Sequence, residues 1–256
     1  MKKTLIALAL AALGQAVPAL PVLIQPVEPE RVELPAAPAA ETFPAGRLTQ
    51  TVKSLQIGPQ SGITKVLGEK RKVLWSRGFD DQKVARLTEE QQRAMLAAAQ
   101  VPEQQIASLS QQLMQDYAHL PHAQCVALLG ALAVHPALGR PERLQIEQWL
   151  NRLLSLEKKD TVTRRQALLA LALLPEASDA TVTTMLRTYE SSRNLWETFP
   201  ISQFVQYHAV ELWQRPDGPL IKQRLGSVPS IYTPVMLEEM ARQEPPPATP
   251  VLGEPH

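Results

Sequence analysis

The chain has 256 residues, of which 45% are hydrophobic and 20% are charged, and its formal net charge is +1. That length is sufficient for one substantial hydrophobic core with additional tails. The near-neutral charge excludes a protein-wide field that would attract nucleic acid or strongly acidic partners. Alanine and leucine are plentiful, which favours a helical fold.

Residues 1–16 have the features of a signal peptide. Two lysines precede the compact apolar run 4–13, and small residues occupy the −3 and −1 positions of a cleavage site after Ala16, with Ala19 as the alternative. The apolar run is about half the ~20 residues that a membrane-spanning helix needs. We therefore expect a cleaved signal peptide and a periplasmic mature protein that does not span the membrane.

Cys125 is the only cysteine. The exported chain therefore has no internal disulfide, and no cysteine beside the cleavage site could carry a lipid. Because Cys125 lies in a strongly apolar predicted helix, we expect a buried, inert thiol. The alternative is an intermolecular disulfide.

Residues 17–46 contain seven prolines among Ala, Val and Glu. Proline removes a backbone donor and fixes φ, so neither a helix nor a central strand can continue through this segment. We expect an extended, disordered linker. It serves either as a spacer between the signal peptide and the folded body or as a docking arm that orders on a partner.

Residues 47–87 are predicted to form a β-hairpin-like or extended segment. Two β-type runs, 63–67 and 72–75, flank a polar turn that contains Gly68. The basic side chains around this turn would protect an edge strand from unwanted pairing. The alternative is contact with phosphates or with an anionic membrane surface.

Residues 88–243 are predicted to form a helical domain, followed by a disordered tail over 244–256. Thr88 and Gln91 fit a capping box at the first helix start, and prolines mark several later starts because the first N–H of a helix has no intrahelical partner. The predicted helices cover 88–100, 102–119, 121–134, 141–156, 161–174, 179–189 and 200–213, and two shorter helices over 220–225 and 235–242 cap the array.

Two segments of this domain repeat at a spacing of 40 residues. Cys125–Ala133 and Arg165–Leu173 align on Ala127-Leu128-Leu129 and Ala167-Leu168-Leu169. Each unit has an amphipathic helix followed by a more apolar one, which must be buried between its own partner and the neighbouring units. Helix pairs at this period are typical of HEAT or armadillo arrays, whereas tetratricopeptide repeats have a period of about 34 residues.

Through these Ala-Leu-Leu segments and the prolines at helix starts, residues 102–213 resemble HEAT-like (armadillo-type) helical repeats. The third unit departs from the pattern, since Gln206–Val210 replaces the Ala-Leu-Leu core. The resulting fold class is mainly α, a short α-solenoid of about three antiparallel helix pairs with a small β-hairpin-like N-terminal element and disordered ends. The resemblance implies a protein-binding scaffold and carries over no catalytic residues.

Candidate chemical sites are few. His119, His122 and Cys125 are spaced by three, but a proline interrupts the helix between the histidines, so we expect no metal site. His208 and Glu211 share a predicted helix face and are interpreted as a structural hydrogen bond. Serine-hydrolase, phosphate-loop and His-Glu-x-x-His motifs are absent from the sequence. We therefore expect no cofactor and no enzymatic activity.

Most of the aromatic residues gather between positions 189 and 213. Helical spacing favours core positions for Phe204 and Tyr207, whereas Trp196 and Phe199 lie in a predicted connection that could expose them. Exposed aromatics on a rigid scaffold are typical anchors for a partner. The candidate partner-binding residues are Trp196, Phe199, Tyr189 and Tyr207.

The sequence thus predicts a non-enzymatic interaction or assembly scaffold that binds another envelope protein. The alternative is a protein that binds an envelope polymer or a small hydrophobic ligand in the aromatic cluster at 189–213. Nucleic acid is not an expected partner.

Overall fold

The computed structural model describes residues 43–55, 57, 74, 76–79, 87–156, 160–192 and 194–243. All of them belong to one unit within residues 39–256. The predicted signal peptide, the first predicted hairpin strand and the predicted tail lie outside the described residues, as does nearly all of the predicted linker and of the second strand.

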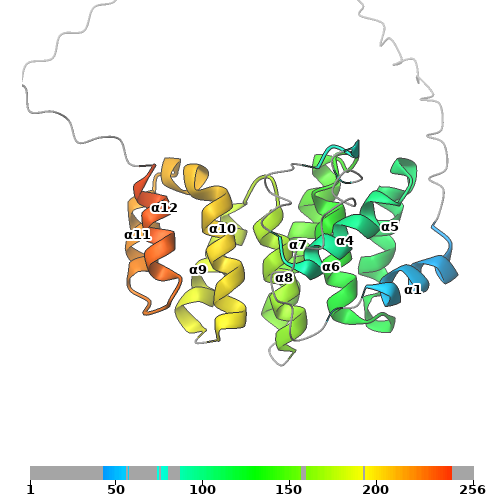
Figure 1. The fold of residues 1–256 in the computed structure, drawn as a ribbon, viewed down its shortest axis with the longest axis horizontal. Coiled ribbons are helices and arrows are strands. Elements are labelled where there is room, and N and C mark those ends of the chain that lie inside the picture. The colour runs from blue at the N-terminus through cyan, green and yellow to red at the C-terminus, as the bar shows by residue number, and fades with distance from the viewer. Residues whose placement is uncertain are drawn as a thin grey trace, which may run out of the picture. The chain divides into compact units, whose positions relative to one another are not determined.

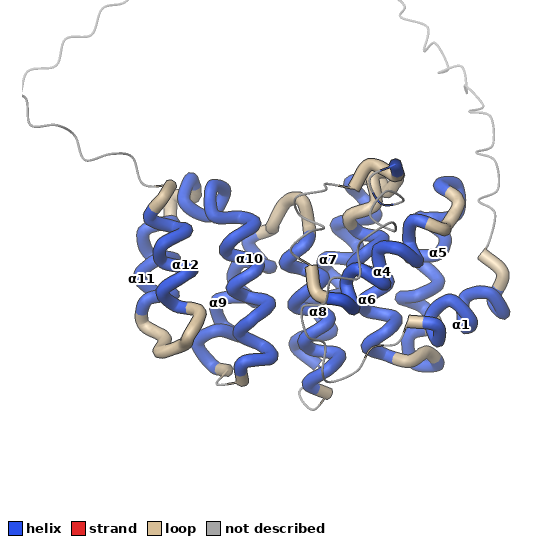
Figure 2. The backbone as a smooth tube through the Cα atoms, in the orientation of Figure 1, coloured by secondary structure: helices blue, strands red, loops and turns tan. Residues whose placement is uncertain are grey.

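The described residues are mainly α-helical, and no strand occurs among them (Figure 1; Figure 2). The elements are α1 (Ala45–Ser54), α4 (Glu89–Ala99), α5 (Glu103–Gln115), the 3-10 helix η1 (Tyr117–His119), α6 (His122–Ala133), α7 (Arg140–Leu156), α8 (Thr161–Leu173), α9 (Asp179–Ser191), α10 (Leu195–Gln214), α11 (Gly218–Gly226) and α12 (Thr233–Ala241).

Helix α1 corrects the expectation that the chain is extended from residue 47 onward. Leu48, Val52 and Leu55 are all buried. Their spacing of three to four residues is the period of a helix face, not the alternation of a strand. The early part of the 47–87 segment is therefore helical because these side chains share one buried face.

Three predicted helix starts, those of α4, α8 and α9, are confirmed, and each has a side-chain cap. Thr88 and Gln91 form both bonds of the capping box, with the Thr88 N–H donating to Gln91 Oε1 at 2.9 Å and the Gln91 N–H to Thr88 Oγ1 at 3.3 Å. Asp160 accepts from the first turn of α8, and Ser178 accepts from the first turn of α9. These caps satisfy backbone donors that would otherwise have no partner.

Helix α10 begins earlier than predicted. The sequence predicts a start at Pro200, but the helix starts at Leu195, and Pro200 lies inside it. The Asn194 side chain caps the helix by accepting from the Trp196 N–H at 3.0 Å. Pro200 has no backbone N–H, so the Trp196 carbonyl lacks its usual hydrogen bond within the helix. Contacts of the first turn with other helices offset this loss.

The helices of residues 87–243 contact one another in two series. Helices α4, α6, α8, α10 and α12 contact each other in chain order, and so do α5, α7, α9 and α11. Helices α6, α8, α10 and α12 each also contact the helix that precedes them. Buried apolar side chains from all ten α-helices of the described residues join one contiguous core.

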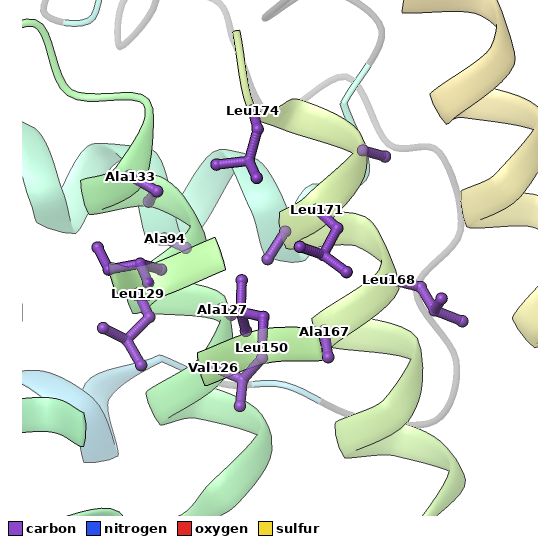
Figure 3. Close-up of a cluster of buried hydrophobic side chains, with 14 of the residues drawn as sticks. Ala94, Val126, Ala127, Leu129, Ala133, Leu150, Ala167, Leu168, Leu171 and Leu174 are labelled. Carbon is purple, nitrogen blue, oxygen red and sulfur yellow. The ribbon is translucent and has the colours of Figure 1, made fainter. Parts of the chain in front are cut away.

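The two repeated segments are α6 and α8, and they pack directly together (Figure 3). Almost every residue in the second half of each helix is buried. The approach is close at Gly130, where a Cβ atom would lie 2.5 Å from the Cβ of Ala170. Gly130 and Ala170 occupy equivalent positions in the repeat, so the small residues of the pattern set the distance between neighbouring apolar helices.

Candidate functional site

The structure separates the four predicted partner-binding residues. Tyr189 is fully buried, and its hydroxyl hydrogen-bonds Thr233 Oγ1 of α12 at 2.5 Å. Tyr189 therefore lies inside the core, where it links α9 to α12, and not on the surface of the described residues. Phe199 and Tyr207 are partly buried in α10, and Trp196 alone of the four is exposed.

The predicted aromatic cluster at 189–213 does not form. The Phe199 ring lies 5.9 Å from the Tyr232 ring, and the Phe204 ring lies 4.8 Å from the His208 ring. Trp196 and Trp213 face the cations of Arg165 and Lys222, respectively. Since these side chains contact different neighbours, they do not line one ligand pocket.

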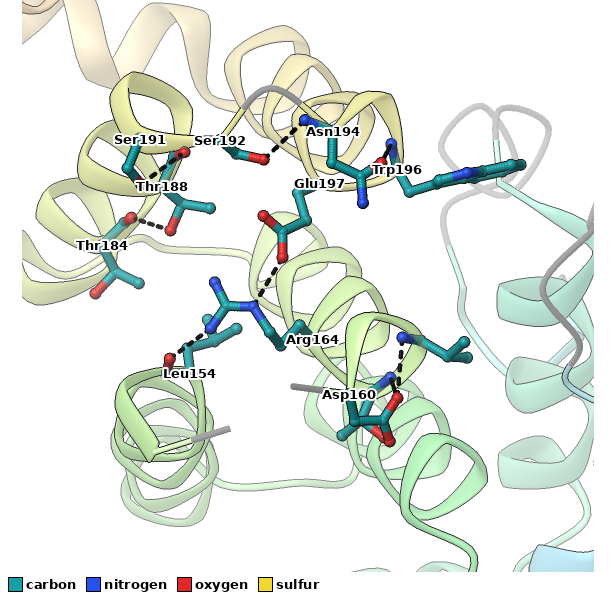
Figure 4. Close-up of polar contacts among 12 residues, drawn as sticks. Leu154, Asp160, Arg164, Thr184, Thr188, Ser191, Ser192, Asn194, Trp196 and Glu197 are labelled. Carbon is teal, nitrogen blue, oxygen red and sulfur yellow. Dashed lines mark hydrogen bonds and ion pairs between the residues drawn. The ribbon is translucent and has the colours of Figure 1, made fainter. Parts of the chain in front are cut away.

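Trp196 is held in a defined position although it is 49% exposed. It lies in the first turn of α10 and extends away from that helix (Figure 4). The guanidinium carbon of Arg165 is 5.1 Å from the centroid of its ring. A cation over an indole face is attracted by the ring quadrupole, and this attraction increases when the cation is desolvated.

Arg165 is itself fixed by a buried ion pair. One of its terminal nitrogens donates to both carboxylate oxygens of Glu90, at 2.8 and 2.7 Å, and Gln166 donates to the same carboxylate at 3.2 Å. The side chains of Arg165 and Glu90 are only 5% and 3% exposed. Glu90, Arg165 and Trp196 come from α4, α8 and α10, so this three-residue Trp196 platform ties three helices of one series together.

A second ion pair fixes the start of α10. Arg164 Nε donates to Glu197 at 2.8 Å, and an Nη of the same side chain donates to the Leu154 carbonyl at the end of α7 (Figure 4). Leu195, beside Trp196, is also exposed. Trp196 and its neighbour Leu195 are therefore two exposed apolar side chains on a backbone that is held by bonds to α7 and α8.

A groove of about 720 Å³ lies at the other end of α8 and α10, between the start of α7, the α8–α9 turn and Glu211. Two carboxylates hold the α8–α9 turn of this groove in place. Glu147 accepts from the Ser178 N–H at 3.0 Å and from Thr181 Oγ1 at 2.5 Å, and Glu211 accepts from the Ala177 N–H at 3.3 Å. These bonds satisfy backbone donors at the N-terminus of α9.

The structure gives structural roles to the residues considered for chemistry. His208 Nδ1 and Glu211 lie 2.9 Å apart, which is the hydrogen bond that the sequence predicts. Cys125 is fully buried with its thiol 3.4 Å from the Leu113 carbonyl, and burial together with Asp116 raises its pKa to about 12. In the folded chain this thiol is therefore protonated and shielded from an intermolecular disulfide. No group of three or more possible metal-ligating side chains converges in the described part of the chain.

His135 is a buried titratable group that belongs neither to the Trp196 platform nor to the lining of the groove. Its ring packs edge-on against Phe79, and its pKa is lowered first by burial and then by Arg77 and Arg143, against an opposing effect of Glu103. A histidine with a lowered folded-state pKa binds its proton more readily in the unfolded chain. Stability is therefore complete above the unfolded pKa of about 6.5 and falls as the pH decreases below it.

We expect the free energy of unfolding to decrease between pH 7 and pH 5, with a slope of up to about 1.4 kcal/mol per pH unit from one proton. Urea denaturation at several pH values measures it. His135→Gln should reduce this slope, whereas replacement of the exposed His119 by glutamine should leave it unchanged. Equal slopes for the wild type and His135→Gln would contradict the assignment.

Comparison with protein-family models, with curated proteins and with solved structures gave no match. Among the described helices, none has both the length and the apolar character needed to cross a membrane. The assignment of function therefore depends on the geometry of this chain.

Glu90 and Arg165 were missed by the sequence interpretation. They are separated by 75 residues, and no local pattern pairs them. One signal in the sequence could have indicated this pair. In α4 and in α8, a charged residue occupies a position that faces the core. Arg165 lies two residues before the apolar run of α8 begins at Ala167, and a charged residue is rarely buried without a partner.

Proposed function

We propose that this protein is a HEAT-like α-solenoid that acts as a non-enzymatic scaffold and binds another envelope protein through the Trp196 platform. The two series of helix contacts support the repeat arrangement, because each apolar helix is covered by its own partner and by neighbouring units. The observation that carries the binding role is Trp196, which is half-exposed yet fixed by the buried Glu90–Arg165 pair.

Pre-organisation is the physical reason that this residue suits recognition. Tryptophan is enriched among the residues that dominate binding energies. A side chain that is already held in position loses less conformational entropy when a partner covers it. Leu195 extends the apolar surface, so the partner is expected to present an apolar pocket that accepts the indole.

The test is capture of the partner by purified full-length variants. Trp196→Ala should weaken binding about 30-fold, which corresponds to about 2 kcal/mol for loss of a dominant interface residue. Leu220→Ala on α11 is the matched control, since Leu220 is 53% exposed, and Trp196→Phe should retain part of the affinity. The proposal fails if Trp196→Ala captures the same proteins, in the same amounts, as Leu220→Ala.

We also propose that the protein is exported and that its N-terminal signal peptide is cleaved near Ala16, as the lysines and the short apolar run at the start of the chain indicate. Mass spectrometry of the protein from a periplasmic fraction tests this. An intact N-terminus in the cytoplasmic fraction would disprove it.

A further inference from the structure

A second groove lies between α5 and α7, which contact each other. This Trp149 groove has a volume of about 390 Å³ and is lined by Gln111, Met114, Gln115, Gln145 and Trp149. None of these five side chains carries a charge, although charged residues make up 20% of the chain. A charged ligand would lose its water here without gaining an opposite charge, so the lining favours a neutral ligand.

Amide groups supply the polar part of the Trp149 groove. The side chains of Gln111 and Gln115 on α5 and of Gln145 on α7 are exposed. Gln111 and Gln115 are four residues apart, so they lie on the same face of α5. Each amide offers two N–H donors and a carbonyl oxygen that accepts, and a hydroxyl group likewise both donates and accepts. A ligand rich in hydroxyls therefore matches these amides whichever way each amide is turned.

Trp149 supplies an apolar surface that is already held in place. Its side chain is partly buried and packs against the core, as does that of Met114. The Trp149 ring lies edge-on to the Tyr117 ring at 5.0 Å, and the Tyr117 ring stacks on His122 at 4.3 Å. Because these contacts orient the indole before a ligand arrives, less conformational entropy is lost on binding.

A sugar ring combines the two properties that this lining requires. Its hydroxyl groups lie around the rim, and its C–H groups form an apolar, weakly positive face that the electron-rich face of an indole attracts. A peptide fits less well, because peptide sites place several side chains in apolar pockets or pair the peptide backbone with a sheet edge. Trp149 and Met114 are the only apolar residues of this lining.

We propose that the Trp149 groove binds a neutral oligosaccharide. One sugar ring packs on the indole of Trp149, and the hydroxyl groups of the ligand bond to the amides of Gln111, Gln115 and Gln145. The volume of about 390 Å³ lies near the lower end of the range of ligand sites, which suits a short stretch of a polysaccharide chain. The site is built from α5 and α7, whereas Trp196 lies in α10, so it does not depend on the proposed role of Trp196.

Calorimetric titration of the full-length protein tests the proposal. The neutral ligands are maltotetraose, cellotetraose and the tetramer of N-acetylglucosamine, and the charged ones are the tetramers of galacturonic acid and of glucosamine. We expect at least one neutral tetramer to bind with a Kd of about 1 mM or lower, and both charged tetramers to bind about tenfold more weakly than that one. Absence of binding by every neutral tetramer at millimolar concentration, or equally tight binding of a charged one, would overturn the proposal.

A neutral peptide tests the competing class of ligand. Acetylated and amidated Gly-Leu-Gln-Leu-Gln-Gly offers amides and aliphatic side chains but no hydroxyl groups. We expect it to bind more weakly than the best neutral tetramer. If this peptide binds more tightly than every saccharide, the Trp149 groove is a site for a protein segment, and the proposal is wrong.

Variants locate the binding on the protein. Gln111→Ala and Gln145→Ala change exposed side chains, so both should fold, and each should weaken binding of the best neutral tetramer about three- to tenfold, the effect of one neutral hydrogen bond. Trp149→Phe keeps an aromatic ring in the core contact and should weaken binding several-fold. Gln223→Ala removes the same amide from an exposed position of α11 and is the matched control. If Gln223→Ala weakens binding as much as Gln145→Ala, the saccharide does not bind in this groove, and the proposal is overturned. Trp196→Ala should leave saccharide binding unchanged.

Discussion

Replacement of Glu90 by alanine is expected to lower the free energy of unfolding by about 3–5 kcal/mol, because it leaves the Arg165 charge buried without its partner. Chemical denaturation followed by circular dichroism measures the change. Glu176→Ala removes a carboxylate from the exposed pair with Arg140 and is the matched control. It should cost no more than about 1 kcal/mol.

A double variant separates the loss of the pair from the loss of packing. Replacing Glu90 by leucine and Arg165 by methionine removes both charges, and apolar replacements of a buried pair are often neutral or stabilising. We expect this double variant to recover most of the stability that Glu90→Ala loses. The Trp196 side chain should also become more mobile in this variant, since the cation that faces the indole is gone. A cost for Glu90→Ala equal to that of Glu176→Ala would contradict the burial of this pair.

Gly130→Ala is expected to destabilise the protein by about 1–3 kcal/mol, the usual cost of overpacking a core. The sign of the change in the free energy of unfolding is informative, because replacing glycine by alanine in an unhindered helix stabilises by about 1 kcal/mol. At Gly130 the new Cβ would lie 2.5 Å from the Cβ and 3.0 Å from the Cα of Ala170, so α6 and α8 would have to separate. Thermal or urea denaturation shows whether the variant is less or more stable than the wild type.

Two further variants test this contact. Gly226→Ala is the matched control, since its nearest neighbours would be Leu237 methyl groups at 3.7 Å, an ordinary contact distance. Exchange of the two residues, Gly130→Ala with Ala170→Gly, should restore part of the loss because it removes the clashing Cβ. An increase in stability for Gly130→Ala alone would show that the two helices are farther apart than described.

The parts of the fold that depend on local chemistry could be predicted from the sequence. Thr88 caps its helix through the capping box that the sequence predicts, and Asp160 and Ser178 cap α8 and α9 next to their predicted starts. The repeated Ala-Leu-Leu segments are the buried helices α6 and α8, as expected from their apolar character. These features need only neighbouring residues or a repeated pattern.

Other features required long-range contacts that the sequence does not encode locally. The prolines at helix starts predict that this helix begins at Pro200, but the Asn194 cap and the Arg164–Glu197 pair stabilise an earlier start. Tyr189 is predicted as a candidate partner-binding residue, but it is buried, and Thr233 provides its hydrogen-bond partner 44 residues later. Of the candidate site, Trp196 was predicted, whereas the charges that fix it were not.

Photo-crosslinking from position 196 in cells tests the central claim most directly, because it reports a partner at this side chain without purification. A photoreactive phenylalanine derivative at position 196, and at the similarly exposed position 220 as a control, would be irradiated in the full-length protein. We predict one discrete crosslinked protein from position 196 and none from position 220. No product from position 196, or the same products from both positions, would contradict the role of the Trp196 platform.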